Sequence, residues 1–95
     1  MEIQSRKQCT RIEHLRQKEV INIRDGARLG YVSDVCFDIL SGQLISIIVP
    51  GPCRFFGLFG RDKEYVISWE CIKRIGDDII LVEVNLFEVL KICED

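Results

Sequence analysis

The sequence contains little of several residue types and patterns that mark specialised proteins. It has two prolines, one histidine, one tryptophan and no internal repeat. No apolar run approaches the ~18 residues that a membrane-spanning helix needs. The first residues are charged and lack the apolar core of a secretory signal, so we expect a cytoplasmic protein.

Recognised groups of catalytic residues are also missing. We find no carboxylate pair suited to acid–base catalysis, no Ser-His-Asp set and no glycine-rich phosphate loop. His14 is the one histidine, and its polar surroundings predict an exposed side chain. The sequence therefore predicts no enzymatic activity.

The cysteine pattern lacks the features of a disulfide framework or a zinc site. The chain has five cysteines, and an odd number cannot form a complete set of intrachain disulfides. They are Cys9, Cys36, Cys53, Cys71 and Cys93. None forms a C-x-x-C pair, whereas zinc ligands normally come in closely spaced pairs. We expect free thiols, most of them acting as small apolar residues, and no metal or other cofactor.

What is present fits one folded domain spanning residues 1–95. A hydrophobic fraction of 47% with 29% charged residues argues against intrinsic disorder. Residues 1–10 are polar and without periodicity, which predicts a flexible segment or a weakly attached outer strand. We place the core at about residues 12–84 and treat residues 85–95 as a tail.

The first half of the chain reads as strands and tight turns. Residues 12–18 are predicted to form one helical turn, or a strand and a turn. Residues 20–23 are predicted to form a short strand. Asp25-Gly26 is typical of a hairpin turn. Residues 28–40 form the longest extended candidate, with a bulge predicted near Gly30 or Ser33.

In that extended segment, alternation places three apolar residues on one predicted core face, Val35, Phe37 and Ile39. Asp34 falls on the opposite face, where its carboxylate is expected to bond a neighbouring turn. A second turn is expected at Gly42.

The second half continues the same pattern. Strands are predicted over residues 44–49, 64–68 and 79–84, with a helical turn near residues 69–72 and a brief extended piece at 73–75. Helical spacing of apolar residues in 85–95 predicts an amphipathic helix of two to three turns. Five or six short strands joined by tight turns predict an all-β fold, a small antiparallel barrel.

The loop at residues 53–61 is the strongest candidate site. Loops are normally polar, but this one is rich in apolar side chains between two arginines. Its candidate residues are Arg54, Phe55, Phe56, Leu58, Phe59 and Arg61. The aromatic side chains either cover one end of the barrel as a lid or bind a partner or a second copy, and the sequence leaves both alternatives open.

Charge is distributed unevenly along the chain. The net charge is −2, but residues 1–28 hold seven Lys/Arg against four Asp/Glu, whereas residues 77–95 hold six acids and one lysine. The basic set near the start consists of Arg11, Arg16, Lys18, Arg24 and Arg28. RNA contact is an alternative function for this set, although no aromatic residue is interleaved to stack on bases.

Two stretches carry a resemblance to a known family. The run VINIRDGARLGYVSDVCFDILSGQLISIIV (20–49) resembles the PRC-barrel domain, with its D-G turn, L-G-x-V-x-D strand and following apolar strand. The run IVPGPCRFFGLFGRDKEYVISWECIKRIGDDIILV (48–82) is similar to the sporulation branch, the YlmC/YmxH family. Ser68 and Cys53 depart from the expected proline and glycine.

This resemblance implies an antiparallel barrel with a non-enzymatic role in interaction or assembly. It brings no catalytic residues. We therefore predict an interaction module of sporulation that binds a protein partner or itself, as a homodimer, through residues 53–61. The alternative is a ribosome- or RNA-associated accessory protein, because the family includes the barrel of a ribosome-maturation factor. The predicted turn and bulge residues, Asp25, Gly26, Gly30, Asp34 and Gly42, are structural in this interpretation.

Overall fold

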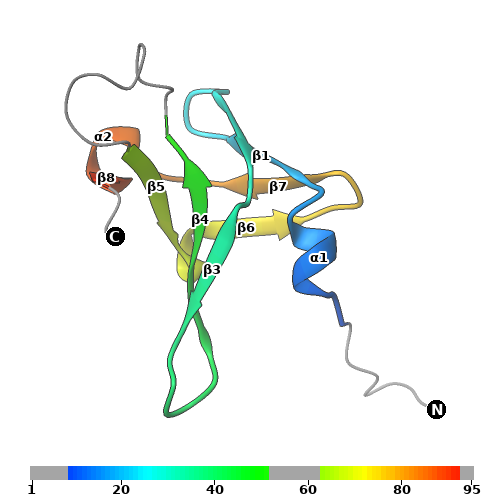
Figure 1. Cartoon of the computed structure of the whole chain (residues 1–95). Helices are drawn as coiled ribbons and strands as arrows, with labels where there is room; N and C mark the ends of the chain where they lie inside the picture. The colour runs from blue at the N-terminus through cyan, green and yellow to red at the C-terminus, as the bar shows by residue number, and fades with distance from the viewer. Residues whose placement is uncertain (1–8, 52–62, 93–95) are drawn as a thin grey trace.

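The structure is a computed structural model that describes residues 9–51 and 63–92 (Figure 1). The strands are β1 (Glu19–Asn22), β2 (Arg28–Tyr31), β3 (Asp34–Phe37), β4 (Leu44–Pro50), β5 (Lys63–Ser68), β6 (Ile72–Ile75), β7 (Ile79–Val82) and β8 (Leu90–Ile92). The helical elements are α1 (Ile12–Leu15), the 3-10 turn η2 (Trp69–Cys71) and α2 (Leu86–Val89). The prediction of a mostly β domain is confirmed, with more strands than the five or six expected.

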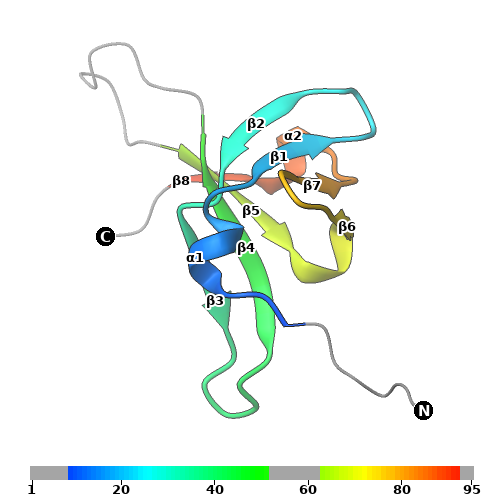
Figure 2. The ribbon, with the colours of Figure 1, turned by 90° about the vertical axis from the view of Figure 1, so that its right-hand side faces the viewer.

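These strands form two four-stranded sheets. Sheet A has the order β2-β1-β7-β6, and sheet B has the order β3-β4-β5-β8. The strands of one sheet run across those of the other, and β2 lies against β4 (Figure 1, Figure 2). Within the described residues the two sheets remain separate hydrogen-bonded units, so they do not form one continuous closed barrel.

One strand pair contradicts the expectation of a purely antiparallel sheet. β1 pairs with β7 in parallel, from Glu19 opposite Ile79 to Asn22 opposite Val82. Parallel neighbours need a long connection, and here the connection includes the whole of β3, β4 and β5. Alternation along β1 predicts a buried face, but it holds no information on the direction of a strand so distant in the sequence.

The extended segment 28–40 is divided between the two sheets. β2 belongs to sheet A and β3 to sheet B, and the chain crosses between them at Val32 and Ser33. Val32 is buried there, while the backbone N–H of Ser33 donates to the carbonyl of Ile48 at 2.8 Å. The register also shifts opposite Val20, which pairs with Gly30 while Ile21 pairs with Arg28, and Gly30 has a φ of 109°. A positive φ at this point suits glycine, because a β-carbon would be strained there.

The core lies between the two sheets. Its members are buried apolar residues contributed by both sheets, by α1, by the crossing between β2 and β3 and by the link after β7. They are Leu15, Val20, Val32, Ile47, Val49, Ile67, Ile80, Val82 and Val84. Complete burial of an aliphatic side chain of this size stabilises the fold by roughly 1.5–3 kcal/mol. The central strands β1, β4, β5 and β7 therefore hold the two sheets together.

The predicted core face of the β3 segment is wrong beyond its first residue. Val35 packs against the core, but Phe37 is 54% exposed and Ile39 is 89% exposed. The β3–β4 hairpin projects away from the two-sheet body, so its outer half has no opposite sheet to pack against (Figure 1). Alternation alone identifies a common side of a strand and cannot show whether that side is covered.

The predicted C-terminal helix of two to three turns is also wrong. Helix α2 has four residues, and the chain then becomes extended as β8, which pairs antiparallel with β5. So short a helix gains little stability in water, whereas the open edge of β5 offers backbone hydrogen-bond partners. Residues 90–92 therefore extend sheet B.

The hairpin tip is held by a set of short hydrogen bonds. The Asp38 carboxylate accepts from the hydroxyl of Ser41 at 2.8 Å and from the backbone N–H of Leu40 at 3.2 Å. The N–H of Gly42, at a φ of 77°, donates to the Asp38 carbonyl at 2.7 Å. The hydrogen bonds to the carboxylate lower the pKa of Asp38 below its usual value. The Ser41 hydroxyl has the larger effect and the N–H of Leu40 the smaller one.

This lowered pKa leads to a pH prediction for the hairpin tip. Because the folded-state pKa of Asp38 is below its unfolded-state pKa of about 3.9, its contribution is complete above that pH and disappears as the pH falls through the folded-state pKa. Ser41→Ala should move the Asp38 titration midpoint up toward the usual value. NMR titration of the carboxyl carbon measures this midpoint, and an unchanged midpoint in Ser41→Ala would contradict the role of the hydroxyl.

Candidate protein-binding site

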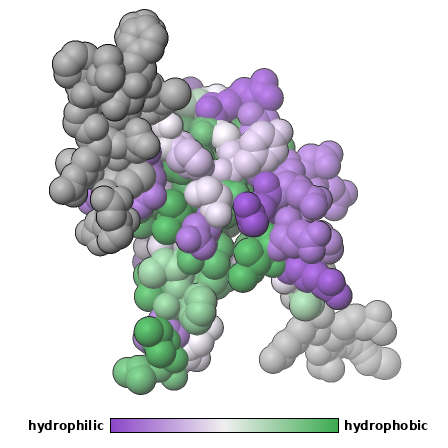
Figure 3. Space-filling view, in the orientation of Figure 1, coloured by the Kyte–Doolittle hydropathy of each residue, from purple (hydrophilic) through white to green (hydrophobic). Residues whose placement is uncertain are grey.

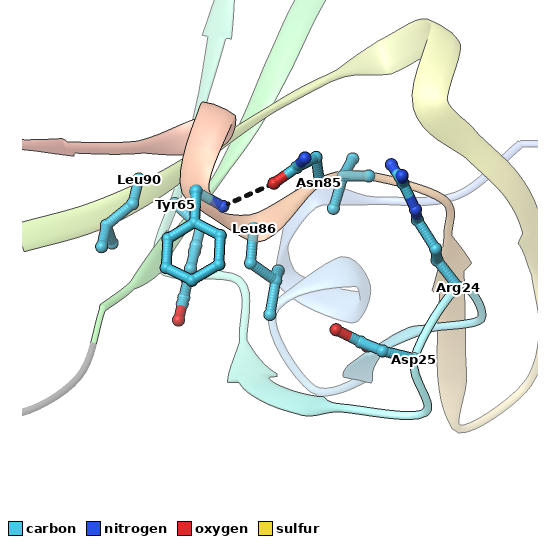
Figure 4. A pocket seen from close by; sticks show the side chains of 8 residues that line it. Arg24, Asp25, Tyr65, Asn85, Leu86 and Leu90 are labelled. Atoms are coloured by element: carbon cyan, nitrogen blue, oxygen red, sulfur yellow. Dashed lines mark hydrogen bonds between the residues drawn. The ribbon is translucent and has the colours of Figure 1, made fainter.

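A groove opens where α2, β5 and the β1–β2 turn come together (Figure 4). It has a volume of about 610 Å³. We call it the α2 groove, and its lining residues are Arg24, Asp25, Tyr65, Val84, Asn85, Leu86, Phe87 and Leu90. Tyr65, Leu86 and Leu90 lie toward one side and the polar pair Arg24 and Asp25 toward the other (Figure 4). A largely apolar groove with a few polar groups is the usual form of a binding site.

Helix α2 positions the apolar side of the groove. Asn85 caps the helix, since the N–H of Phe87 donates to its Oδ1 at 3.0 Å. The chain then turns into β8, which places Leu90 opposite Tyr65 in sheet B. Phe87, which follows the cap and lines the groove, is 92% exposed. A large exposed aromatic beside partly buried apolar residues is a feature of protein-binding surfaces.

The groove adjoins the points where residues 52–62 join the sheet. The N–H of Gly51 donates to the carbonyl of Lys63 at 2.8 Å, so β4 ends next to the beginning of β5. A second hollow, of about 220 Å³, is lined by Pro50 and Gly51 and shares Tyr65 and Leu86 with the α2 groove. The predicted site residues Arg54, Phe55, Phe56, Leu58, Phe59 and Arg61 lie outside the described residues.

The structure places the predicted turn residues as follows. Asp25 and Gly26 lie between β1 and β2, where Asp25 Oδ1 accepts from the N–H of Ala27 at 2.9 Å and Gly26 has a φ of 75°. Gly42 lies in the β3–β4 turn, at a distance in the chain from the groove. Asp34 does not bond a neighbouring turn, because its Oδ1 accepts from the N–H of Val35 at 2.8 Å. Of these residues only Asp25 borders the α2 groove.

Two of the five basic residues near the chain start are engaged within the molecule. Lys18 Nζ donates to the carbonyls of Gly76 and Asp77 at 2.5 and 2.8 Å. The guanidinium of Arg28 donates to both carboxylate oxygens of Glu19 at 2.9 and 2.8 Å. This bidentate pair raises the pKa of Arg28 and lowers that of Glu19. The arrangement does not support the alternative of an RNA-binding surface.

The cysteines and possible metal ligands among the described residues do not form a second type of site. Cys9 and Cys36 are exposed free thiols and Cys71 is partly buried. Of these three, only Cys71 packs against the core as a small apolar residue. No three His, Cys, Asp or Glu side chains within residues 9–51 and 63–92 are grouped in a way that could hold a metal ion. In the same residues no helix has the length and apolar character needed to cross a membrane.

The family comparison identifies the class of protein in which these two crossed sheets occur. The PRC-barrel domain model matches residues 11–86, and the chain belongs to the PRC-barrel family. The resemblance derived from the sequence is therefore confirmed.

Three individual proteins show which members of this family the chain resembles. The chain is 35% identical over 74 residues to the probable sporulation protein YlmC of Bacillus subtilis, covering 78% of this chain and 91% of that protein. It is 39% identical to an uncharacterised protein of Clostridium acetobutylicum, over 80% of this chain and 87% of the relative. It is 29% identical to the uncharacterised protein YmxH of Bacillus subtilis, over 78% and 88% of the two chains.

Sequence reasoning missed the α2 groove. Its residues come from three separate parts of the chain, the β1–β2 turn, β5 and residues 84–90. The one available signal was Phe87, an aromatic residue that interrupts the polar side of the predicted tail helix. Only the pairing of β8 with β5 brings Leu90 next to Tyr65.

Proposed function

We propose that this chain is a non-enzymatic interaction module that binds a partner protein during sporulation, in the cytoplasm of an endospore-forming bacterium. Binding takes place through residues 53–61 together with the α2 groove. The partner presents apolar side chains that enter the groove between Tyr65, Leu86 and Phe87.

The α2 groove is the observation that carries this proposal. An apolar groove with the almost fully exposed Phe87 lies beside the two ends of a segment that contains three phenylalanines. Aromatic residues at the centre of an interface contribute most of the binding free energy. Membership in the PRC-barrel family and likeness to a protein named as a probable sporulation protein support the same conclusion.

The test compares matched variants of the full chain. Phe56→Asp with Phe59→Asp, and separately Phe87→Asp, should each weaken binding of the partner at least about 30-fold, because each places a carboxylate in an apolar contact. The partner is captured from sporulating cells on the unaltered chain, purified, and its affinity for each variant measured by calorimetry.

Two controls make the outcome decisive. Ile39→Asp, an equally exposed apolar position on the β3–β4 hairpin, should leave partner affinity unchanged. Circular dichroism must show that every variant is folded. If the Phe56/Phe59 variant unfolds, residues 53–61 are part of the fold itself and the proposal is wrong, and equal affinities for all variants contradict it as well.

A further inference from the structure

The β3–β4 hairpin presents an apolar surface to solvent, at a distance from the α2 groove. Leu40 is 96% exposed and Ile39 89% exposed at its tip, and Phe37 and Ile45 are each about half exposed along it. Figure 3 shows this projecting part of the molecule as predominantly hydrophobic. A cluster of exposed apolar residues on a monomer commonly marks an interaction surface.

The tip is also organised in advance of any contact. Asp38 bonds Ser41 and Leu40, and the N–H of Gln43 donates to the Ser41 hydroxyl at 3.2 Å. These bonds fix the turn that carries Ile39 and Leu40. Binding through a turn that is already ordered loses less conformational entropy than binding through a flexible loop.

A hollow that suits such a tip lies beside α1. It has a volume of about 440 Å³, and Tyr31, Val32 and Pro50 provide its apolar lining. Its polar lining includes Arg16 and Glu13 of the α1 segment. Tyr31, in this lining, is 55% exposed, and Ile12 of α1 is 49% exposed.

The hairpin and the α1 segment have opposite charge. Residues 34–50 contain two aspartates and no lysine or arginine, whereas residues 9–18 contain Arg11, Arg16 and Lys18 against Glu13. A two-fold symmetric interface uses the same patch on both copies, so it requires a patch whose two halves complement each other. The acidic hairpin and the basic α1 segment are two such halves.

The tip cannot reach the hollow of its own chain. Ser33 lines the hollow and Ile39 lies six residues further along an extended hairpin, roughly 20 Å away at the rise of a strand. The separation no longer matters when the hairpins of two copies lie side by side and antiparallel. Each tip then reaches the hollow of the other copy, and both contacts form together.

We propose that this surface binds a second copy of the chain, forming a two-fold dimer in which each hairpin tip inserts Ile39 and Leu40 into the α1 hollow of its partner. The dimer forms through side chains rather than through a continuous sheet. The N–H of Val35 already donates to Asp34 Oδ1, and this bond occupies a donor that an added strand would need.

Leu40→Asp tests the proposal on the full chain. Sedimentation equilibrium should show a dimer for the unaltered chain and at least an about 30-fold higher dimer dissociation constant for Leu40→Asp. Leu40 makes no buried contact, so the variant should fold normally. Phe87→Asp is the matched control, because Phe87 is 92% exposed but lies in the α2 groove, and its dimer should be unaffected.

Cross-linking provides a second measurement. Cys36 lies midway between Ser33 and Ile39, so the proposed alignment brings the two copies of Cys36 near the two-fold axis. A chain that retains only Cys36 should form cross-linked dimers with a short bis-maleimide, and the added Leu40→Asp change should prevent them. A chain that remains monomeric, forms open-ended oligomers, or dimerises equally well with Leu40→Asp would overturn the proposal.

Discussion

Replacing Asn22 by alanine is expected to lower the free energy of unfolding by about 3 kcal/mol. Asn22 ends β1 and is completely buried. Its Nδ2 donates to the carbonyl of Val84 at 3.0 Å, and its Oδ1 accepts from the N–H of Val84 at 3.1 Å. One side chain thus satisfies both backbone groups of a buried residue 62 positions away.

Alanine would leave these two groups of Val84 without partners in the interior. An unpaired buried polar group costs about 1–3 kcal/mol. For a domain of this length the expected loss corresponds to a fall in melting temperature on the order of 10–20 °C. Urea unfolding followed by circular dichroism gives the free energy, and an unchanged dependence on urea concentration would show that the unfolding transition is comparable.

Asn85 provides the matched control for Asn22. It is also an asparagine bonded to the backbone, but it is only partly buried and accepts a single N–H, that of Phe87. Asn85→Ala should cost about 1 kcal/mol or less, as expected for a helix cap. Equal losses in the two variants would mean that the buried pairing with Val84 has no special importance.

Gly51→Ala is expected to destabilise the fold by about 2 kcal/mol and to alter the α2 groove. A β-carbon at Gly51 would lie 2.7 Å from the carbonyl oxygen of Lys63 and 3.1 Å from Leu90 Cδ1. The nearest atom belongs to the backbone, so β4 and β5 must move apart at this end. The hydrogen bond from Gly51 to Lys63 would lengthen, and Leu90 would shift within the groove.

Gly76 is a close control for this change. Its N–H also donates to a carbonyl at 2.8 Å, that of Ile79, but a β-carbon there would lie 3.5 Å from the nearest atom. Gly76→Ala should therefore change the free energy of unfolding by less than about 0.5 kcal/mol. By NMR, the amide chemical shifts of Lys63 and Leu90 should change in Gly51→Ala but not in Gly76→Ala. Identical stability of the two variants would contradict the predicted clash.

Local features of the fold were predictable because they depend on neighbouring residues. The strand of residues 44–49 is apolar and β-branched, and it is observed as β4, in which Ile47 and Val49 are buried. The exposed face of Phe37 and Ile39 was not predictable. Their alternation is the same as that of a core strand, and only the position of the opposite sheet decides whether the face is covered.

The α2 groove and the Asn22 contact depend on distant pairings. Nothing in the sequence around Asn22 distinguishes it from a turn residue, because its partner Val84 is brought to it by the pairing of β1 with β7. The tail was expected to be a helix because its apolar residues have helical spacing. That expectation failed where the open edge of β5 pairs with β8.

The parallel pairing of β1 with β7 also affects the order in which the molecule can fold. β3, β4 and β5 are consecutive neighbours within sheet B. In sheet A the two central strands are β1 and β7, and Val20 of β1 pairs with Ile80, sixty residues later in the chain. Contacts so distant in the sequence form slowly, since a long loop must close first. During synthesis the β3–β4 hairpin can therefore form early, while β1 stays unpaired with β7 until residues 79–82 have been made.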